Sequence, residues 1–247
     1  MQIKLMTANL WLLPWPFSID KNKRMQDLIQ LIKTHQPDVV HLQEVWLNHD
    51  RNKIHKALPE YFVFSAGTWF YNKSGLVTLT KVKPMDSYSF FFKKNRGYNI
   101  QERLANKGWL NCLVNLGDHK LNFINLHLYD PQHTENLSIV TDQFNDLIKF
   151  CQAGDYFLAG DFNMADYELA KLNNGFFEIE KNKEWTLSEA SPYSQTRFNK
   201  KGRVNIKADY FLNKSITGRI ALAEGLLIKE PPVSNHYPVL YTLNIRD

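Results

Sequence analysis

The feature that most constrains the fold is a series of short apolar runs of strand length, broken by turn residues and by a few helical patterns. The chain opens with an alternating run at residues 3–9, an amphipathic pattern at 23–33 and a second strand-like run at 39–45. In the middle segment apolar residues recur at helical spacing from Met25 to Ile32, which indicates a helix with one apolar face. The opening is therefore predicted to be β-α-β.

The middle of the chain is predicted to be rich in β-structure. Gly, Asn, Asp and Lys separate a succession of short apolar runs there, and such residues are typical of turns between strands. The predicted strands cover residues 61–65, 75–80, 87–92, 108–116 and 120–128. Because the runs follow one another along the chain, we expect a β-meander.

The later part of the chain adds one long helix and three strands. The helix is predicted from about residue 136 to residue 150, where apolar residues from Leu137 to Ile148 lie on one face. Strands are predicted at residues 156–159, 209–212 and 239–243. Strands that recur along the whole chain with helices between them predict two sheets covered by helices, a layered α/β sandwich.

Length and composition limit the class of protein. With 247 residues, 44% of them hydrophobic, the chain is long enough to bury a large core. Because no repeat, low-complexity tract or linker divides the sequence, we expect a single domain over residues 1–247. The formal net charge of +5 is compatible with a phosphate-bearing partner, but it is also common among proteins that bind no polyanion.

The sequence also indicates where such a protein would work. Charged residues interrupt every apolar run before it reaches the roughly 18 to 20 residues that a membrane-spanning helix needs. The N-terminal segment lacks the long apolar core of a secretory signal. The two cysteines, Cys112 and Cys151, lie far apart and indicate neither a disulfide framework nor a zinc site. We expect a soluble cytoplasmic protein without an obligate protein partner.

Polar residues with catalytic or metal-binding side chains fall at the ends of the predicted strands. These residues are Asn9, Glu44, His127, Asp161 with Asn163, Asp209, and Asn235 with His236. Strand ends in an α/β protein meet at one rim, where ligands bind. Carboxylates, amides and histidines that are spread over the whole chain are therefore expected to form one site.

The motifs around these residues resemble those of the endonuclease/exonuclease/phosphatase superfamily in order and approximate spacing. They read Thr-Ala-Asn-Leu at 7–10, Leu-Gln-Glu-Val-Trp at 42–46, Ser-Gly-Leu at 74–76, Asn-Leu-His-Leu at 125–128, Gly-Asp-Phe-Asn-Met at 160–164, Ala-Asp-Tyr-Phe at 208–211 and Ser-Asn-His-Tyr-Pro at 234–238. Each motif alone is weak. Their joint occurrence in the family order makes the resemblance strong over nearly the whole chain.

The resemblance implies a deoxyribonuclease-I-like, four-layer α/β sandwich of two packed mixed β-sheets flanked by helices. It also implies a site that binds Mg²⁺, with Mn²⁺ as a substitute. Mg²⁺ is usually held by one or two carboxylates, waters and substrate phosphate. Glu44 and Asn9 are the expected ligands. Asn235 is a third, although the family usually has Asp there, so we expect weaker metal affinity or a one-metal site.

The same resemblance suggests roles for the other polar residues. Water is the expected nucleophile, because no Ser or Cys lies in a recognisable nucleophile motif. Asp161 and Asn163 are expected on an extended segment with their side chains on the same side. Asp161 would then orient or deprotonate the water, and the Asn163 amide would donate a hydrogen bond to the phosphate. Asp209 is expected to keep His236 oriented and cationic. Whether Asp161 or His236 is the base stays open.

Two further residues are expected to contact the substrate. His127 occupies a second histidine position of the family, where it would donate to the phosphate or to the leaving group. Lys107, which comes directly before a predicted strand, is expected with Asn163 and His127 among the substrate-binding residues. A histidine in an apolar strand is more often a core residue with its hydrogen bonds satisfied, and this interpretation of His127 stands beside the functional one.

The substrate class has three interpretations. The tryptophans after Asn9 and Glu44, together with Lys107, resemble the neutral sphingomyelinase branch, which hydrolyses a phospholipid. For membrane contact, residues 11–17 and 89–94 combine aromatic residues with Pro or Lys. For a nuclease that binds DNA or RNA, the basic segments 93–96 and 196–203 would contact the nucleic acid backbone. Core packing and solvated surface explain these segments equally well. The third interpretation is a non-catalytic module that binds a phosphorylated ligand.

Overall fold

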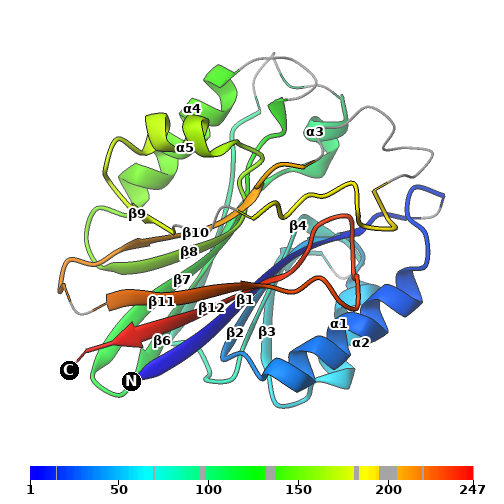
Figure 1. Cartoon of the computed structure of the whole chain (residues 1–247), viewed down its shortest axis with the longest axis horizontal. Coiled ribbons are helices and arrows are strands. Elements are labelled where there is room, and N and C mark those ends of the chain that lie inside the picture. Colours follow the sequence, from blue (N-terminus) through cyan, green and yellow to red (C-terminus); the bar gives the residue numbers. More distant parts are fainter. Residues whose placement is uncertain are drawn as a thin grey trace.

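Two β-sheets pack face to face in this computed structural model, and helices cover their outer faces (Figure 1). The structure describes residues 1–14, 16–68, 70–94, 98, 100–131, 137–180, 184–194, 205–218 and 220–246. Within these residues each sheet has six strands. The predicted layered α/β sandwich of two mixed sheets is confirmed.

The first sheet combines strands from the two ends of the sequence. Its strands, in spatial order, are β11 (Ile220–Leu227), β12 (Val239–Ile245), β1 (Gln2–Leu12), β2 (Val39–Val45), β4 (Asn72–Thr80) and β3 (Phe62–Gly67). β1 and β2 are parallel, and the other pairs are antiparallel. Helices α1 (Lys21–His35) and α2 (Asn48–Ala57) cover this sheet in Figure 1. The β-α-β opening predicted from the sequence is confirmed.

The second sheet is built from the middle of the chain. Its strands, in spatial order, are β5 (Asp86–Phe91), β6 (Gly108–Leu116), β7 (His119–His127), β8 (Asp155–Asp161), β10 (Asp209–Lys214) and β9 (Glu178–Ile179). The helices on this side are α3 (Ile100–Ala105), α4 (Leu137–Phe150) and α5 (Asp166–Asn173). β7 and β8 are parallel, and α4 connects them on the outer face.

The expected single meander divides between the two sheets. β3 and β4 form an antiparallel pair in the first sheet, whereas β5, β6 and β7 form an antiparallel meander in the second. The chain passes from one sheet to the other between Thr80 and Asp86. Alternating apolar residues predict strands but do not say which sheet each joins, so this part of the prediction was wrong.

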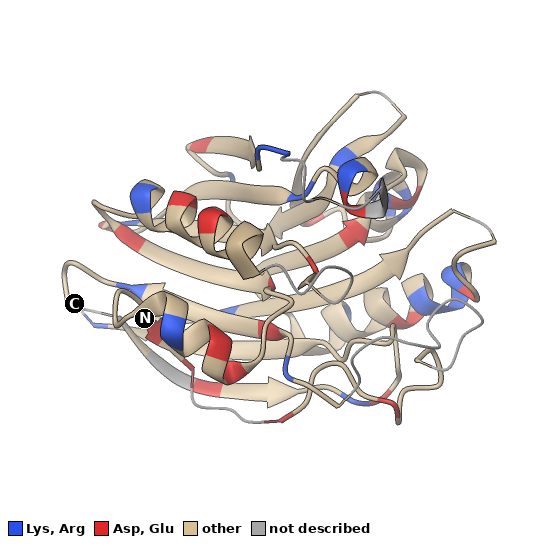
Figure 2. Ribbon diagram, turned by 90° about the horizontal axis from the view of Figure 1, so that it is seen from above, with Lys and Arg blue, Asp and Glu red and all other residues tan. Residues whose placement is uncertain are grey.

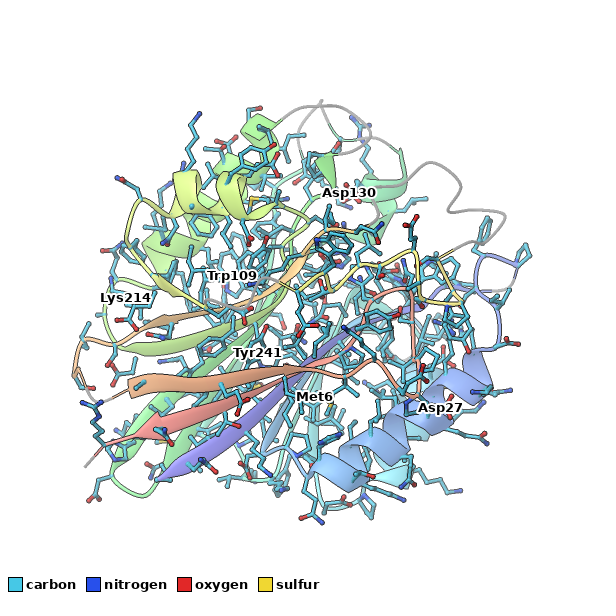
Figure 3. All side chains as sticks on the ribbon, viewed as in Figure 1. Met6, Asp27, Trp109, Asp130, Lys214 and Tyr241 are labelled. Carbon is cyan, nitrogen blue, oxygen red and sulfur yellow. The ribbon has the colours of Figure 1, made fainter. Side chains whose placement is uncertain are left out.

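Apolar side chains form three layers around the sheets. Residues such as Leu5 and Phe157 lie between the sheets. Tyr241 belongs to the same layer, whereas Met6 belongs to the layer between the first sheet and its helices (both are labelled in Figure 3). A third cluster, which includes Phe144 of α4, lies under the helices of the second sheet. Each sheet is therefore apolar on both faces, as expected for the inner layers of a four-layer fold.

A row of hydrogen bonds joins the sheets across the otherwise apolar interior. Gln43 Nε2 donates to Asn125 Oδ1 at 2.8 Å, and Asn125 Nδ2 donates to the carbonyl oxygens of Leu42 at 3.1 Å and Val77 at 2.9 Å. His41 Nδ1 lies 3.1 Å from the carbonyl oxygen of Ala159. Because buried polar groups are costly unless they are paired, these bonds favour one alignment of the two sheets.

Most of the elements that the sequence did not predict are short or polar, and one strand, β11, is irregular. α2 buries Ile54 but otherwise buries the polar residues Asn48 and Asp50, so its apolar periodicity is weak. α3 has six residues, α5 has eight and β9 has two. β11 contains Gly225 and a register irregularity opposite β12. Packing against the rest of the fold stabilises such elements more than their own sequence does.

Two expectations about the kind of protein can also be compared with the structure. Among the described residues, no helix has the length and apolar character needed to cross a bilayer. Cys112 and Cys151 are both buried free thiols, so neither belongs to a disulfide.

The close contact between β7 and β8 gives a prediction about stability. A Cβ atom on Gly160 would lie 2.1 Å from the carbonyl oxygen of Leu126. Gly160→Ala should therefore lower the free energy of unfolding by about 3 kcal/mol or more, because the strands must separate. Urea denaturation measures the loss. The matched control is Gly117→Ala, where φ is +63° but nothing lies within 4 Å; it should lose only about 1 kcal/mol. Equal losses would contradict the clash.

Candidate active site

Strand register brings three of the expected site residues side by side in the second sheet. His127 ends β7 and pairs with Asp161, which ends β8. Asp209 begins β10 and pairs with Asp161 from the other side. Both aspartates are 1% exposed and His127 is 2% exposed. Adjacent strands thus hold one imidazole and two carboxylates in a row at one edge of the sandwich.

Asn9 connects this row to the first sheet. Its Nδ2 atom donates to Asp161 Oδ2 at 2.8 Å and to Glu44 Oε1 at 3.0 Å. The Asn9 Oδ1 atom accepts the backbone N–H of Trp11 at 3.0 Å. The amide is therefore held in one orientation, and it places carboxylates from the two sheets on either side of one nitrogen.

The predicted contact between Asp209 and His236 is present. His236 Nδ1 lies 2.7 Å from Asp209 Oδ2, and both side chains are buried. Thr186 supports this arrangement, because its Oγ1 accepts the backbone N–H of Asp209 at 3.0 Å and its carbonyl oxygen accepts the N–H of Tyr237 at 2.8 Å. The segment that contains Thr186 was not recognised from the sequence, where one threonine gives no distinguishing signal.

Asp161, Asp209 and His236 form a compact polar cluster. One ligand-type atom from each lies within 4.8 Å of the others. The Asp209 Oδ1 atom is buried and has no hydrogen-bond partner among the described residues. Because Asp161 and His236 are buried in the same small volume, their protonation states depend on one another.

The electrostatic environment separates the pKa values of the acid and the histidine. Burial raises the pKa of Asp161 to about 7, with positively charged His236 opposing the shift and Asp209 adding to it. Burial alone would lower the pKa of His236, but the carboxylates of Asp209, Asp161 and Glu44 together raise it to about 9. At neutral pH His236 is therefore cationic, whereas Asp161 titrates near neutrality.

His127 and Lys107 border the same cluster. His127 Nε2 lies 3.4 Å from Asp161 Oδ2, and burial, Lys107 and His236 together lower the pKa of His127 well below its ordinary value. Lys107 Nζ donates to Glu102 Oε1 at 2.9 Å. Burial opposes the charge on Lys107, but Glu102 and nearby acids raise its pKa overall. The site therefore contains a neutral imidazole beside a buried ammonium group.

The expected geometry of Asn163 is wrong. β8 ends at Asp161, and Asn163 has φ of 51° in the left-handed region, so the two side chains do not alternate along one extended strand. The backbone N–H of Asn163 donates to Asp161 Oδ1 at 3.0 Å, and its Nδ2 donates to the carbonyl oxygen of Leu128 at 3.0 Å. Asn tolerates this turn conformation well, so in this structure Asn163 orients Asp161.

Asn235 lies beside His236 in sequence, and its side chain is bonded to its other neighbour. Ser234 Oγ donates to Asn235 Oδ1 at 2.9 Å, and Asn235 is 8% exposed. The oxygen expected as a metal ligand therefore already accepts one hydrogen bond. A carbonyl oxygen has a second lone pair, so this contact leaves one acceptor position on Asn235.

Glu44 is the more exposed carboxylate of the site, and its backbone is unusual. Its φ is 58°, a conformation that is rare outside Gly, Asn and Asp. Hydrogen bonds from Asn72 fix the backbone that follows Glu44. Asn72 Nδ2 donates to the carbonyl oxygen of Val45 at 2.9 Å, and the backbone N–H of Asn72 donates to the carbonyl oxygen of Trp46 at 2.9 Å. A Cβ atom on Gly75 would lie 3.0 Å from the Trp46 ring. The Ser-Gly-Leu motif thus makes room for this tryptophan.

The comparison with protein families agrees with this geometry. Residues 6–215 match the model of the Endonuclease/Exonuclease/phosphatase family, a range that includes every candidate site residue described above except Asn235 and His236. The chain belongs to this family. Its members are phosphoester hydrolases, so the shared chemistry is cleavage of a phosphate ester.

Sequence relatives and solved structures include two kinds of enzyme. The chain is 26% identical over 186 residues to a putative neutral sphingomyelinase of Drosophila melanogaster; the match covers 69% of this chain and 41% of that protein. Sphingomyelinase C from Streptomyces griseocarneus superposes with a TM-score of 0.78 at 16% identity, covering 98% of this chain and 99% of the other. At that identity the likeness shows the fold.

A protein that was solved in a complex with DNA has the same fold. TDP2 of D. rerio, in a complex with a single strand DNA product, superposes with a TM-score of 0.78 at 17% identity, covering 98% of this chain and 99% of the other. The expected deoxyribonuclease-I-like sandwich is confirmed. A fold shared by lipid and DNA enzymes does not distinguish their substrates.

The contact between Asp209 and His236 gives a prediction about ionisation. Asp209→Asn removes the negative charge nearest to the imidazole, so the pKa of His236 should fall from about 9 to 6.5 or below. NMR titration of the histidine ring protons measures the change. Asp86→Asn, on the exposed start of β5, is the matched control and should leave the value unchanged. An unaltered pKa in Asp209→Asn would contradict the assignment of the charge partner.

Proposed function

We propose that this chain is a Mg²⁺-dependent phosphodiesterase that acts on a phospholipid of the sphingomyelin type. The observation that carries the proposal is the buried cluster of Asp161, Asp209 and His236, which Asn9 connects to Glu44. In a chain that belongs to a phosphoester hydrolase family, these groups fit the hydrolysis of a phosphate ester by water.

The donor set fits a hard divalent cation. Glu44 contributes a partly exposed carboxylate, and Asp209 Oδ1 is a buried oxygen without a partner among the described residues. Oxygen donors of this kind suit Mg²⁺, and Mn²⁺ as a substitute. Glu44 would hold the ion, and Asn9 would fix the orientation of the Glu44 carboxylate. Asn235 occupies the position where the family usually has Asp. A bound Mg²⁺ would polarise the phosphoryl group and offset negative charge on the leaving oxygen.

Asp161 and His236 have different proposed roles, one as a proton acceptor and the other as a cation. Asp161, with a pKa near 7, is suited to accept the proton of the attacking water on a carboxylate oxygen. His236 stays protonated at neutral pH because of Asp209, so its Nε2–H is available to stabilise charge on the phosphate. His127 Nε2 lies 3.4 Å from Asp161 Oδ2, and His127 and Lys107 would bind phosphate oxygens. Asp161 is thus the proposed base.

Exposed apolar side chains near the site support a lipid substrate. Phe17 is 49% exposed and Ile19 is 46% exposed in the loop after β1, and Phe70 is 59% exposed before β4. Phe17 and Ile19 follow β1, which carries Asn9, and the carbonyl oxygen of Phe70 accepts the backbone N–H of Asn48, four residues after Glu44, at 3.2 Å. Aromatic side chains at an edge suit contact with a membrane surface. The similarity to a putative neutral sphingomyelinase supports the same substrate class.

Parts of the two segments first expected to contact a membrane are buried instead. Trp11 is 9% exposed and Phe92 is 5% exposed, so both pack in the core. Phe90 is partly buried and stacks on Trp109 with ring centroids 4.0 Å apart. For these three residues the packing interpretation is confirmed. The membrane contact is proposed for Phe17, Ile19 and Phe70, while Trp15 lies outside the described residues.

A nuclease is the second candidate, because a similar structure was solved with a single strand DNA product. The basic segment at 196–203 lies outside the described residues, as do residues 95 and 96 of the other basic segment. Within the described residues, Lys and Arg are interspersed with Asp and Glu along the helices (Figure 2). Nucleic acid binding usually uses a concentrated basic surface, so the lipid is the preferred substrate.

A panel of substrates tests the proposal. Purified protein with Mg²⁺ should release phosphocholine from sphingomyelin vesicles and should act poorly on plasmid DNA, abasic duplex DNA and inositol phosphates. His236→Ala is the blank, because it removes the proposed cation from the site. Turnover of DNA alone would overturn the lipid substrate. No His236-dependent turnover of any substrate would favour a module that binds a phosphorylated ligand.

The proposed metal site gives a prediction about Mg²⁺ dependence. Glu44→Gln replaces the main anionic ligand by a neutral amide of the same shape, so the Mg²⁺ concentration for half-maximal activity should rise about tenfold or more. Initial rates over a Mg²⁺ titration measure the effect. Glu60→Gln, an exposed change between α2 and β3, should leave the titration unchanged. The same Mg²⁺ requirement in both variants would exclude Glu44 as a ligand.

The departure from the family pattern at Asn235 gives a separate prediction. Asn235→Asp restores a carboxylate beside His236, so the Mg²⁺ concentration for half-maximal activity should fall by about tenfold. Asn52→Asp adds the same charge on the exposed face of α2 and serves as control. If Asn235→Asp leaves the metal dependence unchanged, Asn235 is not close enough to act on the ion.

A further inference from the structure

Arg24 is a buried arginine on α1 that the proposed reaction does not use. It is 1% exposed. Its Nε donates to the carbonyl of Ile19 at 2.9 Å, and its Nη1 donates to the carbonyls of Leu10 at 2.7 Å and Val233 at 3.4 Å. Its Nη2 donates to the carbonyl of Trp11 at 3.2 Å and to Ser18 Oγ.

This bonding pattern uses the full capacity of the side chain. A guanidinium group has five N–H donors in a planar fork, and the five acceptors of Arg24 are four backbone carbonyls and one hydroxyl. The rings of Trp11 and Tyr193 lie over the guanidinium, with centroids 5.6 Å and 5.2 Å from its Cζ. A buried charge is costly unless it is fully bonded, so such a residue favours one arrangement of the surrounding backbone.

The acceptors belong to segments that carry site residues. The carbonyls of Leu10 and Trp11 come directly after Asn9, which connects Glu44 to Asp161. The carbonyl of Val233 comes three residues before His236. One side chain therefore joins the backbone that leaves Asn9 to the backbone that leads to His236.

The segment that contains Ser191 and Tyr193 also contacts Arg24, through the Tyr193 ring. The backbone N–H of Tyr193 donates to Ser191 Oγ at 3.4 Å, and Ser191 Oγ donates to the carbonyl oxygen of Ser234 at 2.6 Å. Ser234 lies two residues before His236. The loop that ends at His236 is thus held by Arg24 through Val233 and by the Tyr193 segment through Ser234.

We propose that Arg24 is a positioning residue for phosphoester hydrolysis. It holds the segments after Asn9 and before His236 so that the two side chains meet Asp161 and Asp209 where the sheets join. The inference rests on the proposed function, but the geometry of the cluster can be measured without activity. Hydrogen bonds from a planar fork fix direction as well as distance, and Lys, with one nitrogen, cannot make the same five bonds.

The test compares Arg24→Met with Leu28→Ala. Leu28 lies one turn further along α1 and is fully buried, so its truncation also destabilises the helix packing, but it makes no hydrogen bond to the site segments through its side chain. Both variants are assayed with bis-p-nitrophenyl phosphate and Mg²⁺ at a temperature where circular dichroism shows them folded. Arg24→Met should lose about tenfold or more in kcat with little change in KM, because misplaced groups slow the reaction. Leu28→Ala should keep its kcat although its Tm falls.

Chemical rescue and NMR separate positioning from loss of stability. Methylguanidinium added to Arg24→Ala should restore part of kcat, whereas methylammonium should not. The downfield Nδ1–H resonance of His236, hydrogen-bonded to Asp209, should persist in Leu28→Ala and disappear or broaden in Arg24→Met. This resonance is informative even if the wild-type protein hydrolyses none of the substrates, so failure of the proposed function is distinguishable from failure of the positioning role.

A second variant covers the case in which Arg24→Met does not fold. Tyr193→Leu leaves Arg24 in place but removes the ring on one face of the guanidinium, and it should weaken the His236 resonance and lower kcat in the same direction by a smaller factor. The proposal is overturned if the His236 resonance and kcat in the folded variants match the wild type, or if both fall in proportion to Tm in Leu28→Ala as well.

Discussion

The structure depends on one amide nitrogen that serves two carboxylates from different sheets. Asn9 Nδ2 bonds both Glu44 of the first sheet and Asp161 of the second. Two acids at close range repel each other unless a donor or cation lies between them. The amide therefore makes it possible to join the sheets at an acidic edge, and the hydrogen bonds between Gln43 and Asn125 deeper in the interface continue the same alignment. The geometry of the candidate site and the packing of the sheets are therefore aspects of one set of contacts.

The two histidines show how burial and neighbouring charges together give the same side chain two different protonation states. His236 bonds Asp209 closely and is held cationic, whereas His127 lies near Lys107 and is held neutral. Burial favours the neutral form of both rings, and at His236 the neighbouring carboxylates outweigh this effect. A site with one cationic and one neutral imidazole can donate to a phosphate from both, while only the second can also accept a proton. This division agrees with a family that cleaves phosphate esters.

Much of the fold and the cluster could be predicted from the sequence because strand periodicity and ordered motifs are local signals. The helix at α1 and the strands at β2 and β6 follow from such signals, whereas the contact between Asp209 and His236 was implied by the family resemblance. Sheet membership of β3 and β4 could not be predicted, since it depends on contacts between distant segments. The turn at Asn163 was missed because a Gly-Asp-Phe-Asn run fits a strand end and a left-handed turn equally well. Arg24 gave no signal, since a lysine- and arginine-rich helix start usually faces solvent.

The position of β1 has a consequence for how the chain reaches its final state. β1 lies between β2 and β12, and Gln2 pairs with Asn244, so the two ends of the sequence are neighbours (Figure 1). On the ribosome, one edge of β1 stays without its partner until β12, at residues 239–245, has been made. An unpaired strand edge is prone to association with other chains, and contacts between distant residues form slowly. With this topology, the edge of β1 that later pairs with β12 therefore needs protection from association with other chains during synthesis.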